Sequence, residues 1–265
     1  MAIGITIKKE NFEKFKNQFE KYANENGFKF NYTGGSIAKA TVTGISNKSY
    51  TGSAIKPAPV VKLGSTTLKS GTDYTVAYKN NTNAGTASVT ITGKGSYTGT
   101  ITKTFKITAA SIAKATVTGI ANKYYTGKAI TQTPVVKLGS KTLKKGTDYT
   151  VAFKNNKAIG TATVTIKGKG NYNGTVSKTF KIIPKKTTLK TATSPKKGQL
   201  KVTYSKQTNI SGYQITYSTD KSFKTKTSKS SAKLTKTISG LKSGKTYYVK
   251  VRTYKTVNGT KYYSG

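Results

Sequence analysis

Ser36-Ile-Ala-Lys-Ala-Thr-Val-Thr-Gly-Ile45 opens a stretch, residues 36–107, that the chain then repeats, starting with Ser111-Ile-Ala-Lys-Ala-Thr-Val-Thr-Gly-Ile120. Further along, Gly71-Thr-Asp-Tyr-Thr-Val-Ala77 returns as Gly146-Thr-Asp-Tyr-Thr-Val-Ala152. The offset is constant, since 111 − 36 and 146 − 71 both give 75. A period of this length exceeds the roughly 20 to 50 residues of solenoid and propeller units. The repeat therefore predicts small, self-sufficient domains in tandem.

Each repeat is dense in β-strand signals. Short runs of β-branched and aromatic residues alternate with polar ones, and in the first copy they are 41–43, 59–63, 74–78, 87–91 and 100–107. Gly- and Asn-containing turns separate these runs, at 50–52, 64–65, 70–71, 80–81 and 93–95. Six or seven short strands at this spacing predict an all-β fold, an antiparallel sandwich of immunoglobulin (Ig) type in each copy.

The spaced motifs of the repeat resemble a known family. Tyr50-Thr-Gly-Ser-Ala-Ile55, Leu68-Lys-Ser-Gly-Thr-Asp-Tyr-Thr-Val76, Gly85-Thr-Ala87 and Gly93-Lys-Gly-Ser-Tyr-Thr-Gly99 look like bacterial Ig-like repeats. Such repeats occur in secreted and wall-associated proteins of Gram-positive bacteria. The resemblance covers both copies and implies a module for surface display, outside the cell or on its wall, without an activity of its own.

A different pattern follows residue 184. The runs 199–204, 212–218 and 246–254 alternate strongly, and Leu241-Lys-Ser-Gly-Lys-Thr-Tyr247 resembles the tyrosine corner of fibronectin type III domains. The resemblance implies a structural role for Tyr247, whose hydroxyl would bond to the backbone upstream. Tyr204 stands where that family usually has a Trp. We expect the last strand of this sandwich to be missing and its neighbour to be an unpaired edge.

The first 35 residues differ from the rest. Ile residues alternate over 3–7 as in a short strand, and Phe12, Phe15, Phe19 and Tyr22 then follow a helical spacing. Residues 1–25 resemble the C-terminal segment of DHH-family single-strand-specific DNA exonucleases, without that family's catalytic motifs. A gene fusion or truncated frame explains this segment best, and a native functional cap is the alternative.

These patterns define four expected parts. Residues 1–35 form a strand–helix segment and linker, 36–110 and 111–184 the two Ig-like repeats, and 185–265 the fibronectin type III-like domain. The linkers are short, so we predict a semi-rigid rod. No run approaches the roughly 18 apolar residues of a transmembrane helix, and the N-terminus has no visible signal peptide.

The charge is extreme, with 47 Lys and Arg against 7 Asp and Glu, a net +40. Residues 1–35 hold six Lys and four Glu, or +2, which leaves +38 on residues 36–265. Such a field attracts polyanions. The candidate polyanion-binding residues lie among the Tyr-rich strands near the C-terminus: Lys201, Lys250, Arg252, Lys255 and Lys261. The alternative is that these are ordinary solvated faces, which also discourage edge-to-edge aggregation.

Residue types exclude much chemistry. The chain has no Cys and no His, so thiolate, imidazole and zinc-finger sites are absent. The acids of residues 36–265 are Asp73, Asp148 and Asp220, and the first two are equivalent positions that we interpret as formers of Asx-type turns. We therefore expect no catalytic residue, metal or cofactor.

Two sharper alternatives concern the repeat loops. An intramolecular Lys–Asn isopeptide bond would need a buried Lys beside Asn80-Asn81 or Asn155-Asn156, where ordinary turn formation is the better interpretation. The Gly93-Lys-Gly95 loop lacks the strand–loop–helix context of a phosphate site, so its glycines are interpreted as turn residues.

The function predicted is therefore a non-enzymatic spacer or adhesion module, monomeric, extracellular or wall-associated, whose Lys-rich faces bind anionic wall polymers or glycans non-specifically. The alternative is a nucleic-acid-binding protein that uses the same basic faces and the exonuclease-like N-terminal segment. Salt dependence separates the two, because non-specific DNA binding is lost near physiological salt.

Overall fold

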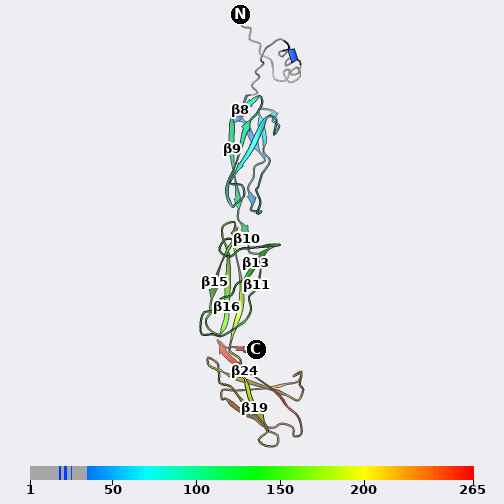
Figure 1. Ribbon diagram of the computed structural model, residues 1–265, viewed down its shortest axis with the longest axis vertical. Coiled ribbons are helices and arrows are strands. Elements are labelled where there is room, and N and C mark those ends of the chain that lie inside the picture. Colours follow the sequence, from blue (N-terminus) through cyan, green and yellow to red (C-terminus); the bar gives the residue numbers. More distant parts are fainter. Residues whose placement is uncertain (1–17, 19–20, 23–24, 26–34) are drawn as a thin grey trace. The chain divides into compact units, whose positions relative to one another are not determined.

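The computed structural model describes residues 18, 21–22, 25 and 35–265, and over the last of these ranges it is built of β-strands (Figure 1). The chain forms two compact units, Met1–Thr108 and Ala109–Gly265. The strand expected at 3–7 and three of the four aromatic residues of the expected helix lie outside the described residues. The fourth, Tyr22, is helical and 63% exposed.

The first repeat has two main sheets. One has the order β2-β4-β5 and the other β3-β9-β7-β6, and the parallel pair β1-β8 stands apart from them. The elements are β1 (Gly35–Ser36), the 3-10 turn η1 (Ile37–Lys39), β2 (Thr41–Thr43), β3 (Lys48–Ser49), β4 (Val60–Leu63), β5 (Thr66–Thr67), β6 (Tyr74–Lys79), β7 (Gly85–Gly93), β8 (Tyr97–Thr98) and β9 (Thr100–Thr108).

The second repeat, in the other unit, has the same topology, with sheets β11-β13-β14 and β12-β18-β16-β15 and the pair β10-β17 (Figure 1). Its strands are β10 (Ala110–Ser111), β11 (Thr116–Thr118), β12 (Lys123–Tyr124), β13 (Val135–Leu138), β14 (Lys141–Thr142), β15 (Tyr149–Lys154), β16 (Gly160–Gly168), β17 (Tyr172–Asn173) and β18 (Thr175–Ile183). The all-β, Ig-like fold predicted for both copies is confirmed.

The sequence pattern predicted purely antiparallel sandwiches, but each repeat also contains parallel strand pairs. β3 runs parallel to β9, and β1 runs parallel to β8. These pairs join strands that are far apart in the sequence, which a hairpin cannot do. They extend over two residues each, so local alternation carries no signal for them.

The repeat cores follow from strand alternation. On β7, Ala87, Val89 and Ile91 are buried while the intervening residues are more exposed. The same positions of β16, Ala162, Val164 and Ile166, are fully buried. Inward-facing residues of both sheets thus form the apolar interior of each sandwich.

The C-terminal sandwich pairs the sheets β19-β20-β23 and β22-β21-β24-β25. Its strands are β19 (Leu189–Thr193), β20 (Leu200–Tyr204), β21 (Gly212–Ser218), β22 (Thr227–Ser231), β23 (Thr235–Ile238), β24 (Tyr248–Val257) and β25 (Thr260–Tyr263). Tyr204 is buried against Tyr213, with ring centroids 4.4 Å apart, and its hydroxyl donates to the Lys233 carbonyl at 2.7 Å. A Tyr at the usual Trp position therefore fills the core and finds a partner for its polar atom.

The expectation of a missing last strand is wrong, because β25 pairs with β24 from Tyr254↔Tyr263 to Val257↔Thr260. Asn258 and Gly259, with φ of 47° and 77°, form the two-residue turn between them. Positive φ at both central residues is the type I′ geometry that Asn-Gly favours. The Asn258-Gly259 pair is thus a local sequence signal for the last strand.

Within the unit 109–265, the β24–β25 hairpin contacts the second repeat. Val257 and Tyr262 pack against a cluster that includes the buried Ile130 and Ile159. The Tyr262 hydroxyl also lies 3.0 Å from Thr161 Oγ1. Apolar packing and a hydrogen bond therefore join the second repeat to the C-terminal sandwich.

Candidate polyanion-binding face

The alternation of β21 and β24 assigns their side chains to two faces. Ile215 pairs with Val251 and faces the core, whereas Gln214 pairs with Arg252 and Thr216 with Lys250 on the outer face. Thr256 lies four residues after Arg252 on β24, so its side chain is on the same outer face. Lys261 of β25 pairs with Thr256 and therefore belongs to that face as well. Three of the five predicted cations therefore share one face of one sheet.

We call this surface the cationic sheet face. It is defined by outward residues of β21, β22, β24 and β25 together with two residues of the β21–β22 connection: Gln214, Thr216, Phe223, Lys226, Ser228, Lys250, Arg252, Tyr254, Lys261 and Tyr263.

Arg252 is held in place by two contacts on this face. Its Nε donates to Gln214 Oε1 at 2.8 Å, and the guanidinium carbon lies 3.9 Å from the centroid of the Tyr263 ring. A guanidinium over an aromatic face is attracted by the negative electrostatic potential of the ring. The hydrogen bond and the ring together fix the plane of this cation.

The two lysines of the face also lie over aromatic rings. Lys250 Nζ is 4.1 Å from the centroid of Phe223, and Lys261 Nζ is 5.0 Å from that of Tyr254. Phe223 has φ 58°, a left-handed conformation uncommon for a bulky residue. The loop that holds it is closed by Asp220, described next.

Asp220 is the one acid of residues 185–265, and its own loop satisfies it. Its carboxylate accepts from the Ser222 hydroxyl at 2.6 Å and from the Ser222 and Lys224 N–H groups, both at 2.8 Å. These hydrogen bonds, from the Ser222 side chain first, lower the pKa of Asp220. The carboxylate therefore fixes the loop that carries Phe223.

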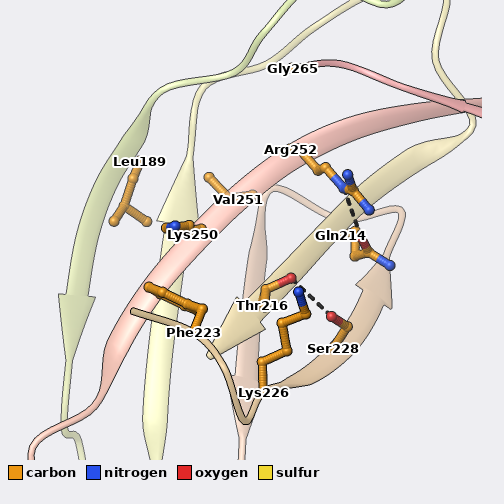
Figure 2. A pocket seen from close by; sticks show the side chains of 10 residues that line it. All are labelled: Leu189, Gln214, Thr216, Phe223, Lys226, Ser228, Lys250, Val251, Arg252 and Gly265. Carbon is orange, nitrogen blue, oxygen red and sulfur yellow. Dashed lines mark hydrogen bonds between the residues drawn. The ribbon is translucent and has the colours of Figure 1, made fainter. Parts of the chain in front are cut away.

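A depression of 570 Å³ occupies part of the cationic sheet face (Figure 2). Three cations border it, Lys226, Lys250 and Arg252, together with the polar side chains of Gln214, Thr216 and Ser228. Figure 2 shows the hydrogen bond between Thr216 and Ser228, 2.9 Å long, beside the Lys226 side chain. Phe223 and Leu189 supply apolar walls.

Two predicted cations lie elsewhere. Lys255 is three residues after Arg252, so its side chain is on the opposite face of β24. It pairs with Tyr262 and is half-buried. Lys201 is on β20 of the opposite sheet, where it pairs with Thr237. The candidate set of five therefore divides, because sequence proximity does not report which face or sheet a residue occupies.

Sequence reasoning missed Gln214, Phe223 and Lys226. Period-2 alternation along 212–218 places Gln214 outward, so that residue was within reach of the pattern. The contact between Phe223 and Lys250 joins a loop to a strand far along the chain, so no local sequence pattern predicts it.

Asp73 and Asp148 close equivalent loops, but not as Asx-type turns. Asp73 Oδ2 accepts from the N–H of Lys69 at 2.7 Å, and Asp148 Oδ2 from that of Lys144 at 2.8 Å. Each carboxylate therefore bonds to the residue four positions upstream.

A lysine of the glycine-rich loop adds to the same turn in each repeat. Lys94 Nζ donates to the Gly71 carbonyl at 2.8 Å, and Lys169 Nζ donates to that of Gly146 at 2.9 Å. A Cβ on Gly93 would lie 2.8 Å from the Tyr97 backbone, so this glycine is required by close packing. These loops are structural in both copies.

The Asn pairs serve the turns that follow β6 and β15. Asn80 and Asn155 have φ of 56° and 57°. The Asn81 amide donates to the Ile55 carbonyl at 3.0 Å, and Asn156 makes the equivalent bond at 2.8 Å. Ordinary turn and loop contacts thus account for both pairs.

Tyr247 makes the contact that the tyrosine-corner resemblance implies. Its hydroxyl accepts from the N–H of Lys242, five residues upstream, at 3.1 Å. The centroid of the Tyr247 ring also lies 6.3 Å from the centroid of the Tyr217 ring.

Among residues 18, 21–22, 25 and 35–265, no three His, Cys, Asp or Glu side chains gather where they could hold a metal ion. The same described ranges contain no helix with the length and apolar content needed to span a bilayer.

Comparisons with known proteins add only distant structural likenesses. No protein-family model and no curated protein matches the sequence. A crystal structure of a run of titin domains is similar over 84% of this chain and 94% of that one, at 12% identity and a TM-score of 0.27. The crystal structure of the chicken CNTN1 FN1–FN3 domains is similar over 64% of this chain and 72% of that one, at 15% identity and a TM-score of 0.26.

Proposed function

We propose that this chain is a non-enzymatic, extracellular spacer and adhesion module whose Lys-rich faces bind anionic polymers of a cell wall or glycan coat. The tandem sandwiches set the attachment surface at a distance, and the basic faces provide the contact. The predicted division at residues 36–110, 111–184 and 185–265 belongs to this proposal, as does a monomeric state.

The observation that carries the proposal is the cationic sheet face. It brings Lys226, Lys250, Arg252 and Lys261 together, and Asp220, the acid of this sandwich, is engaged by its own loop. The charge of +38 on residues 36–265 adds a long-range attraction for any polyanion. Lys supplies nearly all of this charge, which favours contacts with many anionic groups over one sequence-specific readout.

Nucleic acid is the second candidate, because basic strands interleaved with Tyr can bind single strands by stacking and charge. The rings of this face are used differently. Arg252, Lys250 and Lys261 each lie over one ring, so a base stacking on that side would have to displace a cation. The geometry therefore supports charge contacts better than base stacking.

The test is a binding titration of the whole chain against poly(glycerol phosphate), polygalacturonate, neutral dextran and an oligo(dT) strand. Each titration is run from low salt to about 0.15 M, where exposed charges are screened beyond about 8 Å. We expect both non-nucleic polyanions to bind and dextran not to bind, with oligo(dT) lost at the higher salt. Oligo(dT) binding that stays the tightest at about 0.15 M would transfer the proposal to the nucleic-acid alternative.

A further inference from the structure

We propose that the depression on the cationic sheet face is a specific subsite for a carboxylated sugar unit of an acidic polysaccharide, with Arg252 as the carboxylate-binding residue. This inference rests on the proposed function and names the ligand class for one part of it. The Lys-rich faces elsewhere would contribute charge alone.

The first step of the argument is that Arg252 is preorganised. Gln214 holds Nε at 2.8 Å and the Tyr263 ring covers one face of the guanidinium at 3.9 Å. These two contacts use Nε and one face of the guanidinium, so the Nη groups are the donors that would pair with a ligand. A planar fork of this kind matches the two oxygens of a carboxylate, whereas an ammonium group acts as a point charge.

The second step is the chemistry around Arg252. Lys226 and Lys250 border the same depression, so it attracts more than one negative group. The Thr216 and Ser228 hydroxyls and the Gln214 amide line the same depression, and such groups pair well with sugar hydroxyls. Leu189, which is exposed, offers an apolar wall to the C–H face of a ring. The 570 Å³ volume lies within the roughly 300 to 1,000 Å³ of small-molecule sites.

The third step separates this ligand from other polyanions. The oxygens of a polyol phosphate can also pair with the Arg252 fork, but such a chain has no sugar ring to contact the apolar wall. A single-stranded nucleic acid gains much of its affinity by stacking on open aromatic faces. Here Lys250 occupies the face of Phe223, and Arg252 that of Tyr263. An acidic sugar can place its carboxylate on Arg252 and its hydroxyls on Gln214, Thr216 and Ser228 without stacking on either covered ring.

The test compares a substitution in the depression that keeps the net charge with a substitution outside the depression that removes one positive charge. Arg252→Lys preserves net charge but loses the fork, and Lys103→Ala removes one exposed charge on β9 of the other unit. Binding of the full chain to polygalacturonate is measured at about 0.15 M salt. We expect Arg252→Lys to weaken binding about tenfold or more, as for loss of a charged hydrogen bond, and Lys103→Ala less than about twofold.

A second variant, Gln214→Ala, removes the neutral residue that orients Arg252, and we expect a smaller loss of about three- to fivefold. Circular dichroism checks that each variant keeps its β-structure. Poly(glycerol phosphate) has no sugar ring and no carboxylate, so we expect Arg252→Lys to weaken its binding less than that of polygalacturonate.

The outcomes separate the two proposals. If no polyanion binds the unaltered chain at about 0.15 M salt, the proposed function itself fails. If polygalacturonate binds but Arg252→Lys has no larger effect than Lys103→Ala, the subsite is refuted and the general function stands. Stronger binding of poly(glycerol phosphate) or oligo(dT) than of polygalacturonate, with loss of that binding in Arg252→Lys, would overturn the assignment of a carboxylated sugar.

Discussion

The two Ig-like repeats share their strand order and their internal loop contacts, but they differ at one end. Both copies keep the carboxylate of Asp73 or Asp148 and the lysine of the glycine-rich loop in equivalent hydrogen bonds. Where the first copy has Ala84, the second has Ile159, which is 7% exposed. Loop contacts that close each sandwich are thus retained, and the end of the second copy has diverged.

The divergent end of the second repeat is the one contacted by the β24–β25 hairpin. Ile159 belongs to the cluster against which Val257 and Tyr262 pack. Tyr124, at the position of Ser49 in the first copy, has the Lys186 amine 5.9 Å from its ring. At this end, residues that differ between the copies contact the domain that follows, whereas the shared loop residues hold each sandwich together.

A second difference involves two residues inside each copy. In the first repeat the Tyr78 hydroxyl donates to the Pro57 carbonyl at 2.6 Å. The second repeat has Phe153 and Gln132 at these positions, and Gln132 Oε1 accepts from the Ala121 N–H at 2.9 Å. Gln132 Nε2 is the one buried side-chain polar atom without a partner among the described residues. The two copies thus tie the same loop to the sandwich with different hydrogen bonds.

The largest expected effect comes from removing the apolar contact that distinguishes the second repeat. Ile159→Ala deletes a buried side chain at the hairpin contact, so we expect the free energy of unfolding of this unit to fall by about 2 to 4 kcal/mol. Denaturant unfolding followed by circular dichroism measures the change. The control is Ala84→Ile in the first repeat, which introduces the other copy's residue. If Ile159→Ala costs under about 0.5 kcal/mol, the range for ordinary surface substitutions, the specialised contact is refuted.

A smaller effect is expected for the hydrogen bond that only the first repeat makes. Tyr78→Phe introduces the residue of the second copy and leaves the Pro57 carbonyl without this donor. The expected cost is about 1 kcal/mol, measured as a shift of the denaturant midpoint. Phe153→Tyr in the second repeat should not yield a matching gain, because the Gln132 side chain already holds this loop through its bond from the Ala121 N–H. If Phe153→Tyr raised the free energy of unfolding by as much as Tyr78→Phe lowers it, the residues at 57 and 132 would have no part in the difference between the copies.

The same residue predicts a pH dependence. Burial, with the neighbouring Tyr74 as a second cause, raises the pKa of Tyr78 above its usual value. A raised folded-state pKa means that the protonated group favours the native state, so its contribution is complete below the unfolded pKa of about 10. The contribution is lost as pH rises through the higher folded pKa. Stability of the first repeat should therefore fall less steeply above about pH 10 in Tyr78→Phe, as measured by unfolding at stepped alkaline pH; an unchanged slope would contradict the assignment.

The smallest difference between copies is expected where they are identical. Asp73→Asn and Asp148→Asn weaken the same backbone hydrogen bond in each repeat, and each should cost about 1 kcal/mol. The sharp expectation is that the two costs agree within about 0.5 kcal/mol, since the sites share no partners. Thermal unfolding of the two single variants measures this, and clearly unequal costs would show that the loops are not equivalent.

Much of the fold was readable from the sequence, and the candidate site only in part. The 75-residue offset and period-2 runs such as 41–43 and 87–91 predicted the strands β2 and β7, because side chains alternate between a buried and a wet face. The last strand was missed although Asn258-Gly259 is a strong hairpin signal. For the site, Lys250, Arg252 and Lys261 share one sheet face while Lys201 and Lys255 lie elsewhere, and polyanion binding by any of the five stays a prediction.

The sequence alone determined the repeated sandwich, its turns and the basic surface, because alternation, Asn and Gly conformations and charge are properties of short segments. Tertiary structure decided which cations meet. Pairing of β21 with β24 sets Gln214 beside Arg252, the β24–β25 hairpin brings Tyr263 to the same guanidinium, and the loop closed by Asp220 carries Phe223 to Lys250. The Gln214–Arg252 and Phe223–Lys250 contacts join residues far apart in the chain, so they depend on strand and loop placement that no local pattern encodes. The Arg252–Tyr263 contact lies within a hairpin, and there the Asn258-Gly259 turn sets the register.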